Sequence, residues 1–135
     1  MKISLQNKRA LIGGSSKGVG FAVAEQLALS GAQVTIVSSN ELLLKERVLT
    51  LNKKTNLKHN FLVCDYNDHE SYAKKISEYF DINTIDILVN YTQGPIAGDV
   101  NSVSINDYQN AFDLLFKNIV SVSYTHLTLP TIPGV

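Results

Sequence analysis

Apolar and polar positions follow two different spacings along the chain, and the two spacings alternate. Short continuous apolar runs predict buried strands, and they occur at residues 9–12, 33–37, 59–63 and 85–89. Apolar residues three or four positions apart predict helices with one buried face, and they occur at residues 19–27, 43–51, 72–80 and 105–116. Strictly alternating strands and helices predict an α/β fold with a doubly wound parallel sheet, here with about four strands and four helices.

Residues with strong conformational preferences mark the ends of these elements. Ser30-Gly31 is expected to stop the first helix, because glycine readily adopts the left-handed conformation that follows helix ends. Asn40 can cap the second helix, and Asn67 or Asp68 the third, through a side-chain oxygen that accepts a backbone N–H bond. No linker or internal repeat interrupts the pattern, so the 135 residues are expected to form one domain.

Composition removes several classes of function. Twelve basic and twelve acidic residues cancel, so electrostatics favours neither nucleic acid nor an anionic membrane as a partner. No apolar run approaches the roughly 20 residues that span a bilayer. Residues 1–8 are polar and lack the apolar region of a signal peptide. The expected compartment is therefore the cytoplasm.

Cysteine and histidine offer no pattern for a metal site. Cys64 is the only cysteine, which excludes an intramolecular disulfide and a cysteine-based metal site. His59, His69 and His126 are scattered without the spacing of metal ligands. We expect each of them to lie on the surface or to be a hydrogen-bonded core histidine, and we expect no metal.

The sharpest chemical signal is the turn Gly14-Ser-Ser-Lys-Gly18-Val-Gly20, between the first expected strand and the first expected helix. Glycine permits positive φ and lets backbone N–H groups approach a ligand closely. The helix that follows would direct its partially positive N-terminus at the same place. Because strand, turn, helix and second strand occur in this order, the segment predicts a dinucleotide site rather than a purely structural turn.

The spacing G-x-x-x-G-x-G resembles that of the short-chain dehydrogenase/reductase (SDR) family, whose usual form is T-G-x-x-x-G-x-G. Gly13 stands where the family usually has threonine. The resemblance runs from about Lys8 to about Ser121 and implies a partial, Rossmann-like NAD(P)-binding domain at residues 1–121. It implies that the cofactor phosphates are held by residues of the turn, namely Gly14, Ser16, Lys17, Gly18, Val19 and Gly20.

Two further positions match the family in register with this turn. Asp65-Tyr66 follows the third expected strand, where the family has an aspartate that accepts a hydrogen bond from the adenine amino group. Asn90 follows the fourth strand and is retained from the family's N-N-A-G segment, whereas residues 91–93 depart from it. The resemblance implies that Asp65 and Tyr66 lie near adenine and Asn90 on the nicotinamide side of the cofactor.

Residues after the second strand favour NADP(H) over NAD. NAD enzymes of this fold usually place a carboxylate there to bind the ribose 2′-hydroxyl, whereas this chain has Ser38-Ser39-Asn40. Ser39 is expected near the adenosine ribose. Lys17 resembles the basic residue of NADP-preferring family members, with a solvated surface lysine as the alternative.

Catalytic residues of the family are not found in the chain. The family transfers hydride between nicotinamide and a carbonyl or alcohol carbon, and a tyrosine assisted by a lysine four residues later protonates the alkoxide. None of the six tyrosines has lysine at that spacing. Counting from Tyr108 places Leu115 where the family has a relay asparagine, and Asn118 is expected to be a surface residue of the helix. We therefore assign no catalytic residue, and we expect the serine, tyrosine and lysine beyond the end of the chain.

Helical periodicity and family resemblance are both expected to end at about Ser121. From Val122 the sequence reads Val-Ser-Tyr-Thr-His-Leu-Thr-Leu-Pro-Thr, which one frame of a common transposase-based sequencing adapter encodes. We therefore expect residues 122–135 to be a non-native tail, with the gene continuing differently after Ser121. A divergent natural C-terminus is the alternative.

These expectations describe part of an NADP(H)-dependent oxidoreductase that acts on a small carbonyl or alcohol substrate. The resemblance implies a homo-oligomer for the complete protein. A non-catalytic NADP-binding sensor or regulatory protein is the rival hypothesis, because residues 91–93 and Leu115 depart from the family pattern. A sugar-nucleotide epimerase fits less well, because its usual turn is G-x-x-G-x-x-G.

Overall fold

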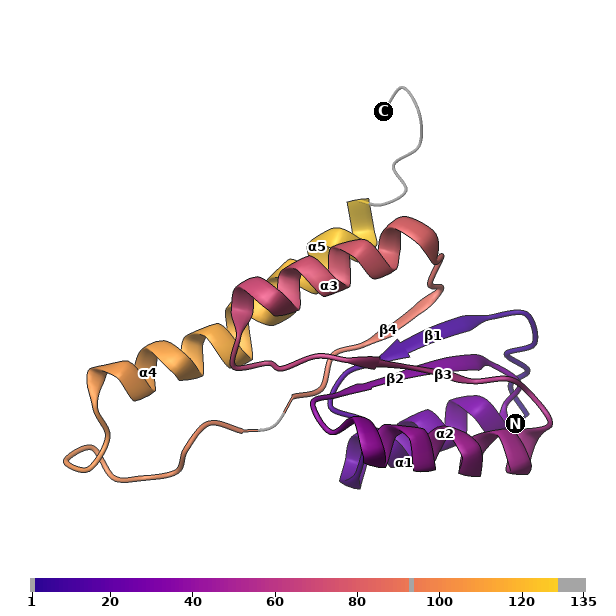
Figure 1. The fold of residues 1–135 in the computed structure, drawn as a ribbon, viewed down its shortest axis with the longest axis horizontal. Helices are drawn as coiled ribbons and strands as arrows, with labels where there is room; N and C mark the ends of the chain where they lie inside the picture. Colours follow the sequence, from indigo (N-terminus) through magenta and orange to yellow (C-terminus); the bar gives the residue numbers. More distant parts are fainter. Residues whose placement is uncertain (1, 93, 129–135) are drawn as a thin grey trace. The chain divides into compact units, whose positions relative to one another are not determined.

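The computed structural model describes residues 2–92 and 94–128, and within them four parallel strands form one sheet in the order β3-β2-β1-β4 (Figure 1). The strands are β1 (Arg9–Ile12), β2 (Gln33–Ser38), β3 (Asn60–Val63) and β4 (Ile87–Val89). The helices are α1 (Gly18–Leu29), α2 (Glu41–Thr55), α3 (His69–Ile82), α4 (Ile105–Phe112), the π-helical turn η1 (Asp113–Lys117) and α5 (Asn118–Thr128). Since α4, η1 and α5 follow one another without a break, the described residues form four helical stretches, and the expected α/β parallel fold is confirmed.

Contacts within the chain define two compact units, which we describe in turn. The first comprises residues 1–64 and 84–91, and the second comprises residues 65–83 and 92–135.

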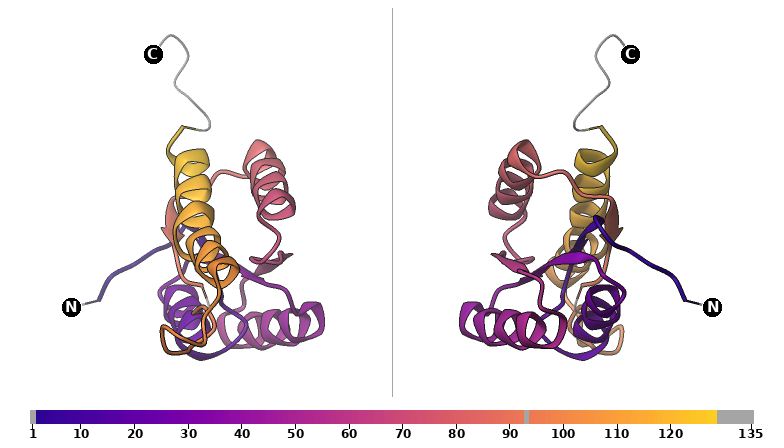
Figure 2. Two further views of the ribbon diagram at one scale, coloured as in Figure 1. Left: turned by 90° about the vertical axis from the view of Figure 1, so that its left-hand side faces the viewer. Right: turned by 90° about the vertical axis from the view of Figure 1, so that its right-hand side faces the viewer.

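In the first unit, α1 and α2 cover the same face of the sheet (Figures 1 and 2). Residues 34–37 of β2 are all buried, as is typical of a central parallel strand. Helix α1 approaches the sheet through a stripe of small residues at a spacing of four, Gly20, Ala24 and Ala28. Helix α2 buries larger side chains, Leu44, Val48 and Leu51. The core of this unit therefore lies between the sheet and these two helices.

The expected helix ends are confirmed. The Asn40 side chain accepts a hydrogen bond from the Leu43 N–H at 3.0 Å, and Asp68 does the same for Ser71 at 3.0 Å. Gly31 follows the last turn of α1 with a φ of 103°. Glycine at this position is therefore required by the backbone conformation.

His59 is a hydrogen-bonded core histidine, one of the two roles expected for it. Its side chain is buried, with 2% of the residue exposed. The Nδ1 atom accepts a hydrogen bond from the Val34 N–H at 3.1 Å, and Nε2 lies 2.7 Å from the Thr55 hydroxyl. Because Nδ1 is an acceptor, this arrangement requires the neutral imidazole, and burial lowers the pKa of His59.

We expect this histidine to make the stability of the first unit depend on pH. The unfolded chain binds a proton at His59 below about pH 6.5, whereas the folded chain resists it, so the free energy of unfolding should fall as pH decreases from that value. Because one group binds one proton, the free energy of unfolding can fall by at most about 1.4 kcal/mol per pH unit. Urea unfolding at pH 7.5 and 5.5 should show a larger loss for the wild-type chain than for His59→Gln. An equal loss in both would contradict this role of His59.

In the second unit, α3 packs alongside α5 and the adjoining η1, which continue from α4 as one helix (Figure 1). Asn118 is completely buried in this unit, and its amide bridges two segments. Its Nδ2 donates to the Tyr66 carbonyl oxygen at 2.7 Å, and its Oδ1 lies 2.6 Å from Nδ1 of His69. The prediction of a surface position for Asn118 was therefore wrong. Its amide is buried because both of its polar atoms find partners there.

The helix also continues past Phe116 and past Ser121, where we expected the periodicity to end. Asn118, Val122 and His126 are four residues apart and therefore share one face of the helix. Val122 is 2% exposed, and the His126 ring lies 5.7 Å from the Phe80 ring of α3. The helix thus continues through Thr128, the last described residue, and it keeps a packed face at least as far as His126. Residues 129–135 of the expected tail lie outside the described residues, and the adapter hypothesis stays a prediction.

Neither a membrane span nor a metal cluster is found in the part of the chain that the structure describes. No helix there combines the length and the apolar character that crossing a bilayer requires. No three histidine, cysteine, aspartate or glutamate side chains gather there as ligands for an ion.

Candidate functional site

The glycine turn joins β1 to α1 at the carboxyl edge of the sheet. Gly14 and Gly18 have φ values of 52° and 59°. Such values belong to the left-handed region that other residues rarely adopt. Glycine is therefore required at both positions by the path of the backbone.

The three glycines of the turn meet different surroundings. A Cβ atom on Gly14 would lie 2.7 Å from the Tyr91 carbonyl oxygen, and one on Gly20 would lie 2.3 Å from the Gly14 carbonyl oxygen. Both distances are too short for any side chain. A Cβ on Gly18 would meet nothing within 4 Å. Gly14 and Gly20 thus allow close packing of backbone on backbone, whereas Gly18 borders open space.

Ser15 fastens the turn to the neighbouring strand, a role that the sequence analysis missed. It is completely buried, and its hydroxyl donates to the Ile12 carbonyl oxygen at 2.6 Å. The same hydroxyl accepts from the Val37 N–H at 2.9 Å, and the Ser15 N–H donates to the Val37 carbonyl oxygen. These bonds hold the turn against the end of β2.

Ser16 and Lys17 lie at the start of α1. The Ser16 hydroxyl donates to the Ser38 hydroxyl at 2.9 Å, so the turn contacts the segment that precedes Ser39. Lys17 is exposed and is the N-cap of α1, but its side chain caps no backbone N–H, and the first turn of α1 carries no acidic residue. The positive end of the α1 dipole therefore faces solvent without a side-chain acceptor from its own cap.

The segment after β4 lies beside the same turn. The Gly13 N–H donates to the Val89 carbonyl oxygen at 3.0 Å, one residue before Asn90. Asn90 is exposed at the end of β4, and Tyr91, which departs from the family pattern, packs against Gly14. The structure thus brings the glycine turn, the Ser38-Ser39 segment and Asn90 to one edge of the sheet.

Asp65 and Tyr66 belong to the second unit and follow directly on Cys64, which ends the first of the two segments that form the first unit. Asp65 is exposed, and its Oδ1 accepts from the Asn67 N–H at 2.9 Å and from the Asn67 amide at 3.1 Å. Tyr66 is buried, with its ring 5.0 Å from the Tyr72 ring. Asp65 therefore stabilises the local turn, and its adenine contact stays a prediction.

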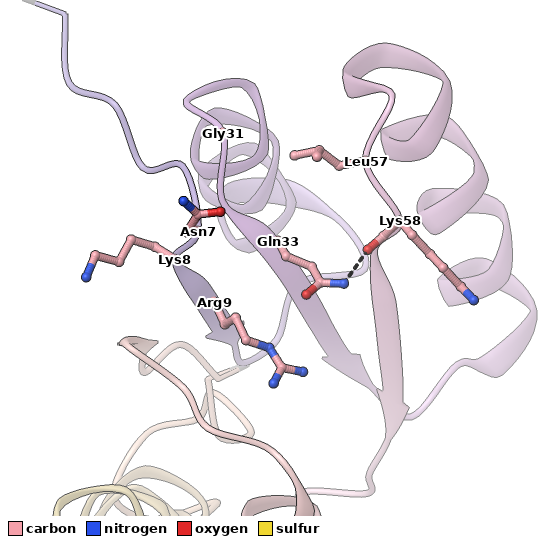
Figure 3. Close-up of a pocket in the computed structure, with 7 residues that line it drawn as sticks. All are labelled: Asn7, Lys8, Arg9, Gly31, Gln33, Leu57 and Lys58. Carbon is pink, nitrogen blue, oxygen red and sulfur yellow. Dashed lines mark hydrogen bonds between the residues drawn. The ribbon is translucent and has the colours of Figure 1, made fainter.

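A pocket of about 320 Å³ lies at the opposite edge of the sheet, where β1 and β2 begin (Figure 3). Three of its lining residues are basic, Lys8, Arg9 and Lys58. Their charged groups point in different directions, and Gln33 is bonded to the Lys58 carbonyl oxygen at 2.8 Å. The basic groups do not converge, so this pocket is not built to surround a single anion.

The chain matches a known family over most of its length. The sequence model described as short chain dehydrogenase matches residues 8–131. The chain belongs to the short-chain dehydrogenase family. The match extends ten residues past Ser121, where we expected the resemblance to end, and the boundary of the domain at that residue stays a prediction.

Curated relatives from this family include reductases and dehydrogenases. The 3-oxoacyl-[acyl-carrier-protein] reductase FabG of Chlamydia muridarum is 33% identical over 91 residues, which are 67% of this chain and 37% of that protein. The 7alpha-hydroxysteroid dehydrogenase of Clostridium sardiniense is 29% identical over 119 residues, 87% of this chain and 45% of that protein. The chain thus spans less than half the length of these relatives.

Solved structures share the fold of this short-chain dehydrogenase chain. L-Sorbose reductase from Gluconobacter frateurii, crystallised with NADPH and L-sorbose, superposes with a TM-score of 0.84 at 25% identity. It covers 93% of this chain, and the chain covers 48% of it. The 2-keto-3-deoxy-D-gluconate dehydrogenase from Streptococcus agalactiae gives a TM-score of 0.76 at 28% identity, covering 93% of this chain and 47% of its own.

Proposed function

We propose that this chain is the NADP(H)-binding part of a short-chain oxidoreductase. The observation that carries the proposal is the turn at Gly18, which combines a positive φ, open space on its outer side and an α1 N-terminus that no side chain caps. A pyrophosphate is the kind of group that such a turn accommodates, because backbone N–H groups and the helix dipole both attract it. The NADPH-bound relative from Gluconobacter frateurii supports the same ligand.

Each part of the cofactor is assigned to residues of the chain. The phosphates would be held by the turn residues Gly14, Ser16, Lys17, Gly18, Val19 and Gly20. Ser39 would lie near the adenosine ribose, and Asn90 near the nicotinamide side. By family resemblance, Asp65 and Tyr66 would contact adenine.

The surroundings of Ser39 support NADP(H) over NAD(H). Glu41, the nearest carboxylate along the chain after β2, pairs with the Lys45 ammonium at 2.6 Å, and this contact lowers the pKa of Glu41. Lys17 adds an exposed positive charge to the turn. A 2′-phosphate would therefore meet positive charge and hydroxyl groups rather than a free carboxylate.

The proposed reaction is hydride transfer between the nicotinamide and a small carbonyl or alcohol substrate. When bound, the cofactor would supply or accept the hydride. No tyrosine here has lysine four residues later, so we assign cofactor binding to this chain and no acid–base step. A homo-oligomer of the complete protein is part of the same proposal.

A titration of the chain with NADPH and NADH, followed by cofactor fluorescence, tests this proposal. We expect NADPH to bind about tenfold or more tightly than NADH, corresponding to about 1.4 kcal/mol. Gly18→Ala should weaken both cofactors strongly, because its Cβ would enter the open space that the phosphates need. Gly94→Ala, where a Cβ also meets nothing within 4 Å, is the matched control and should bind like the wild type. Failure of a folded chain to bind either cofactor would refute the proposal.

The second candidate is a non-catalytic NADP-binding protein. It is supported by Tyr91, whose side chain and carbonyl pack against Gly14 where the family has a smaller motif residue. Cofactor oxidation measured with a panel of ketones and aldehydes on the complete gene product separates the two. Turnover supports the oxidoreductase, and tight binding without turnover supports the sensor.

A further inference from the structure

Arg47 of α2 contacts the glycine turn directly, although it lies 27 residues beyond Gly20 in the sequence. Its Nε donates a hydrogen bond to the Ser16 carbonyl oxygen at 3.1 Å. Its guanidinium carbon lies 4.7 Å from the centre of the Phe21 ring of α1. A ring under a guanidinium attracts the cation and restricts its orientation. Arg47 is therefore held beside the turn by two contacts from the first unit.

The positive charge of Arg47 has no carboxylate partner among residues 2–92 and 94–128. The ion pairs of this part of the chain use other cations, Lys8, Lys45, Lys54 and Lys74. The hydrogen bond to Ser16 engages Nε alone. Both terminal nitrogen atoms of the guanidinium make no hydrogen bond to the described residues, so they can donate to another group.

The position of this charge points to the ribose end of the proposed cofactor. Ser16, whose carbonyl oxygen Arg47 contacts, also donates its hydroxyl to Ser38, the residue before Ser39. Arg47 therefore lies where the glycine turn meets the end of β2. The planar guanidinium can donate two parallel hydrogen bonds to one phosphate group, which a lysine cannot.

We propose that Arg47 is a specificity-determining residue that binds the 2′-phosphate of NADP(H) together with Lys17. This inference rests on the proposed function, because it assigns a role within the same site. It also names the residue that distinguishes NADP(H) from NAD(H), which differ by that phosphate alone. The Phe21 contact and the Ser16 bond orient the guanidinium before the cofactor arrives, which lowers the entropic cost of binding.

The test is a comparison of Arg47→Gln and Arg47→Lys with the wild-type chain, using NADPH and NADH as probes in fluorescence titrations. Arg47→Gln should weaken NADPH binding about tenfold, as the loss of a charge-assisted hydrogen bond implies, and should change NADH binding less than about twofold. The affinity of Arg47→Lys for NADPH should lie between those of the wild type and Arg47→Gln. Lys53→Gln, an exposed cation of the same helix, is the matched control and should leave both affinities unchanged.

Salt provides a second readout that a purely structural role would not move. The affinity of the wild type for NADPH should fall with added salt more steeply than that of Arg47→Gln, because one charge contact is missing in the variant. Thermal unfolding of each variant establishes that it is folded.

Three outcomes would overturn the inference, and they are distinguishable. Equal weakening of NADPH and NADH in Arg47→Gln would mean that Arg47 only supports the turn, with the proposed function intact. Unchanged NADPH binding would remove Arg47 from the site. A folded wild type that binds neither cofactor would refute the proposed function and this inference with it.

Discussion

Gly20→Ala is expected to disrupt the glycine turn and to lower the free energy of unfolding by about 3 kcal/mol or more. The added Cβ would lie 2.3 Å from the Gly14 carbonyl oxygen and 3.0 Å from the Ser15 Cα. Both are backbone atoms, so the clash can be relieved only if α1 moves away from the end of β1. Urea unfolding followed by circular dichroism measures the loss, and binding of NADPH should be lost in parallel.

Gly18→Ala is the control that separates stability from binding. Its Cβ would meet nothing within 4 Å, so the expected loss is confined to the φ of 59° and amounts to about 1–2 kcal/mol. This variant should therefore stay folded while losing cofactor affinity. If Gly20→Ala were as stable as the wild type, the close contact between α1 and the turn would not exist in solution.

Asn118→Leu is expected to destabilise the second unit by about 2–3 kcal/mol, although leucine has nearly the same shape as asparagine. The substitution removes the donor to the Tyr66 carbonyl oxygen and the 2.6 Å contact with Nδ1 of His69. The bond to Tyr66 is shielded from water, because Asn118 is completely buried, and the contact with His69 is partly buried. Loss of the helix signal at lower urea concentration is the observable.

Asn110→Leu is the matched control for this change. Asn110 is an exposed residue of α4 on the same continuous helix, so its replacement should alter the free energy of unfolding by less than about 0.5 kcal/mol. Similar effects of the two substitutions would show that the bridge from Asn118 to Tyr66 and His69 contributes nothing specific.

The order of strands and helices could be predicted because periodicity reports burial directly. The buried run of β2 and the spaced leucines of α2 each follow one spacing without interruption. The helix caps at Asn40 and Asp68 could also be predicted, since a capping side chain lies within three residues of its partner. The glycine turn could be located for the same reason, because its key residues are close in sequence.

Contacts between distant residues could not be predicted in this way. Asn118 was expected on the surface because a polar residue on a helix usually faces water, and nothing local indicates that His69 lies 49 residues away as its partner. Arg47 was missed for the same reason, since its contact with Ser16 joins α2 to the turn across 31 residues. The role of Ser15 could have been predicted, because it is a small residue with a hydroxyl group inside the turn.

The π-helical turn η1 changes the directions in which the side chains that follow it point from the helix. The Asn118 N–H donates to the Asp113 carbonyl oxygen, five residues earlier, so this turn holds one residue more than an α-helical turn. Each residue beyond Lys117 is consequently rotated relative to its place in an uninterrupted helix. Leu115, seven positions after Tyr108, lies inside this wide turn. In a regular α-helix, the side chain seven positions after Tyr108 would therefore point in a different direction. On the side of this helix that faces α3, the chain carries Asn118, whose Oδ1 contacts His69.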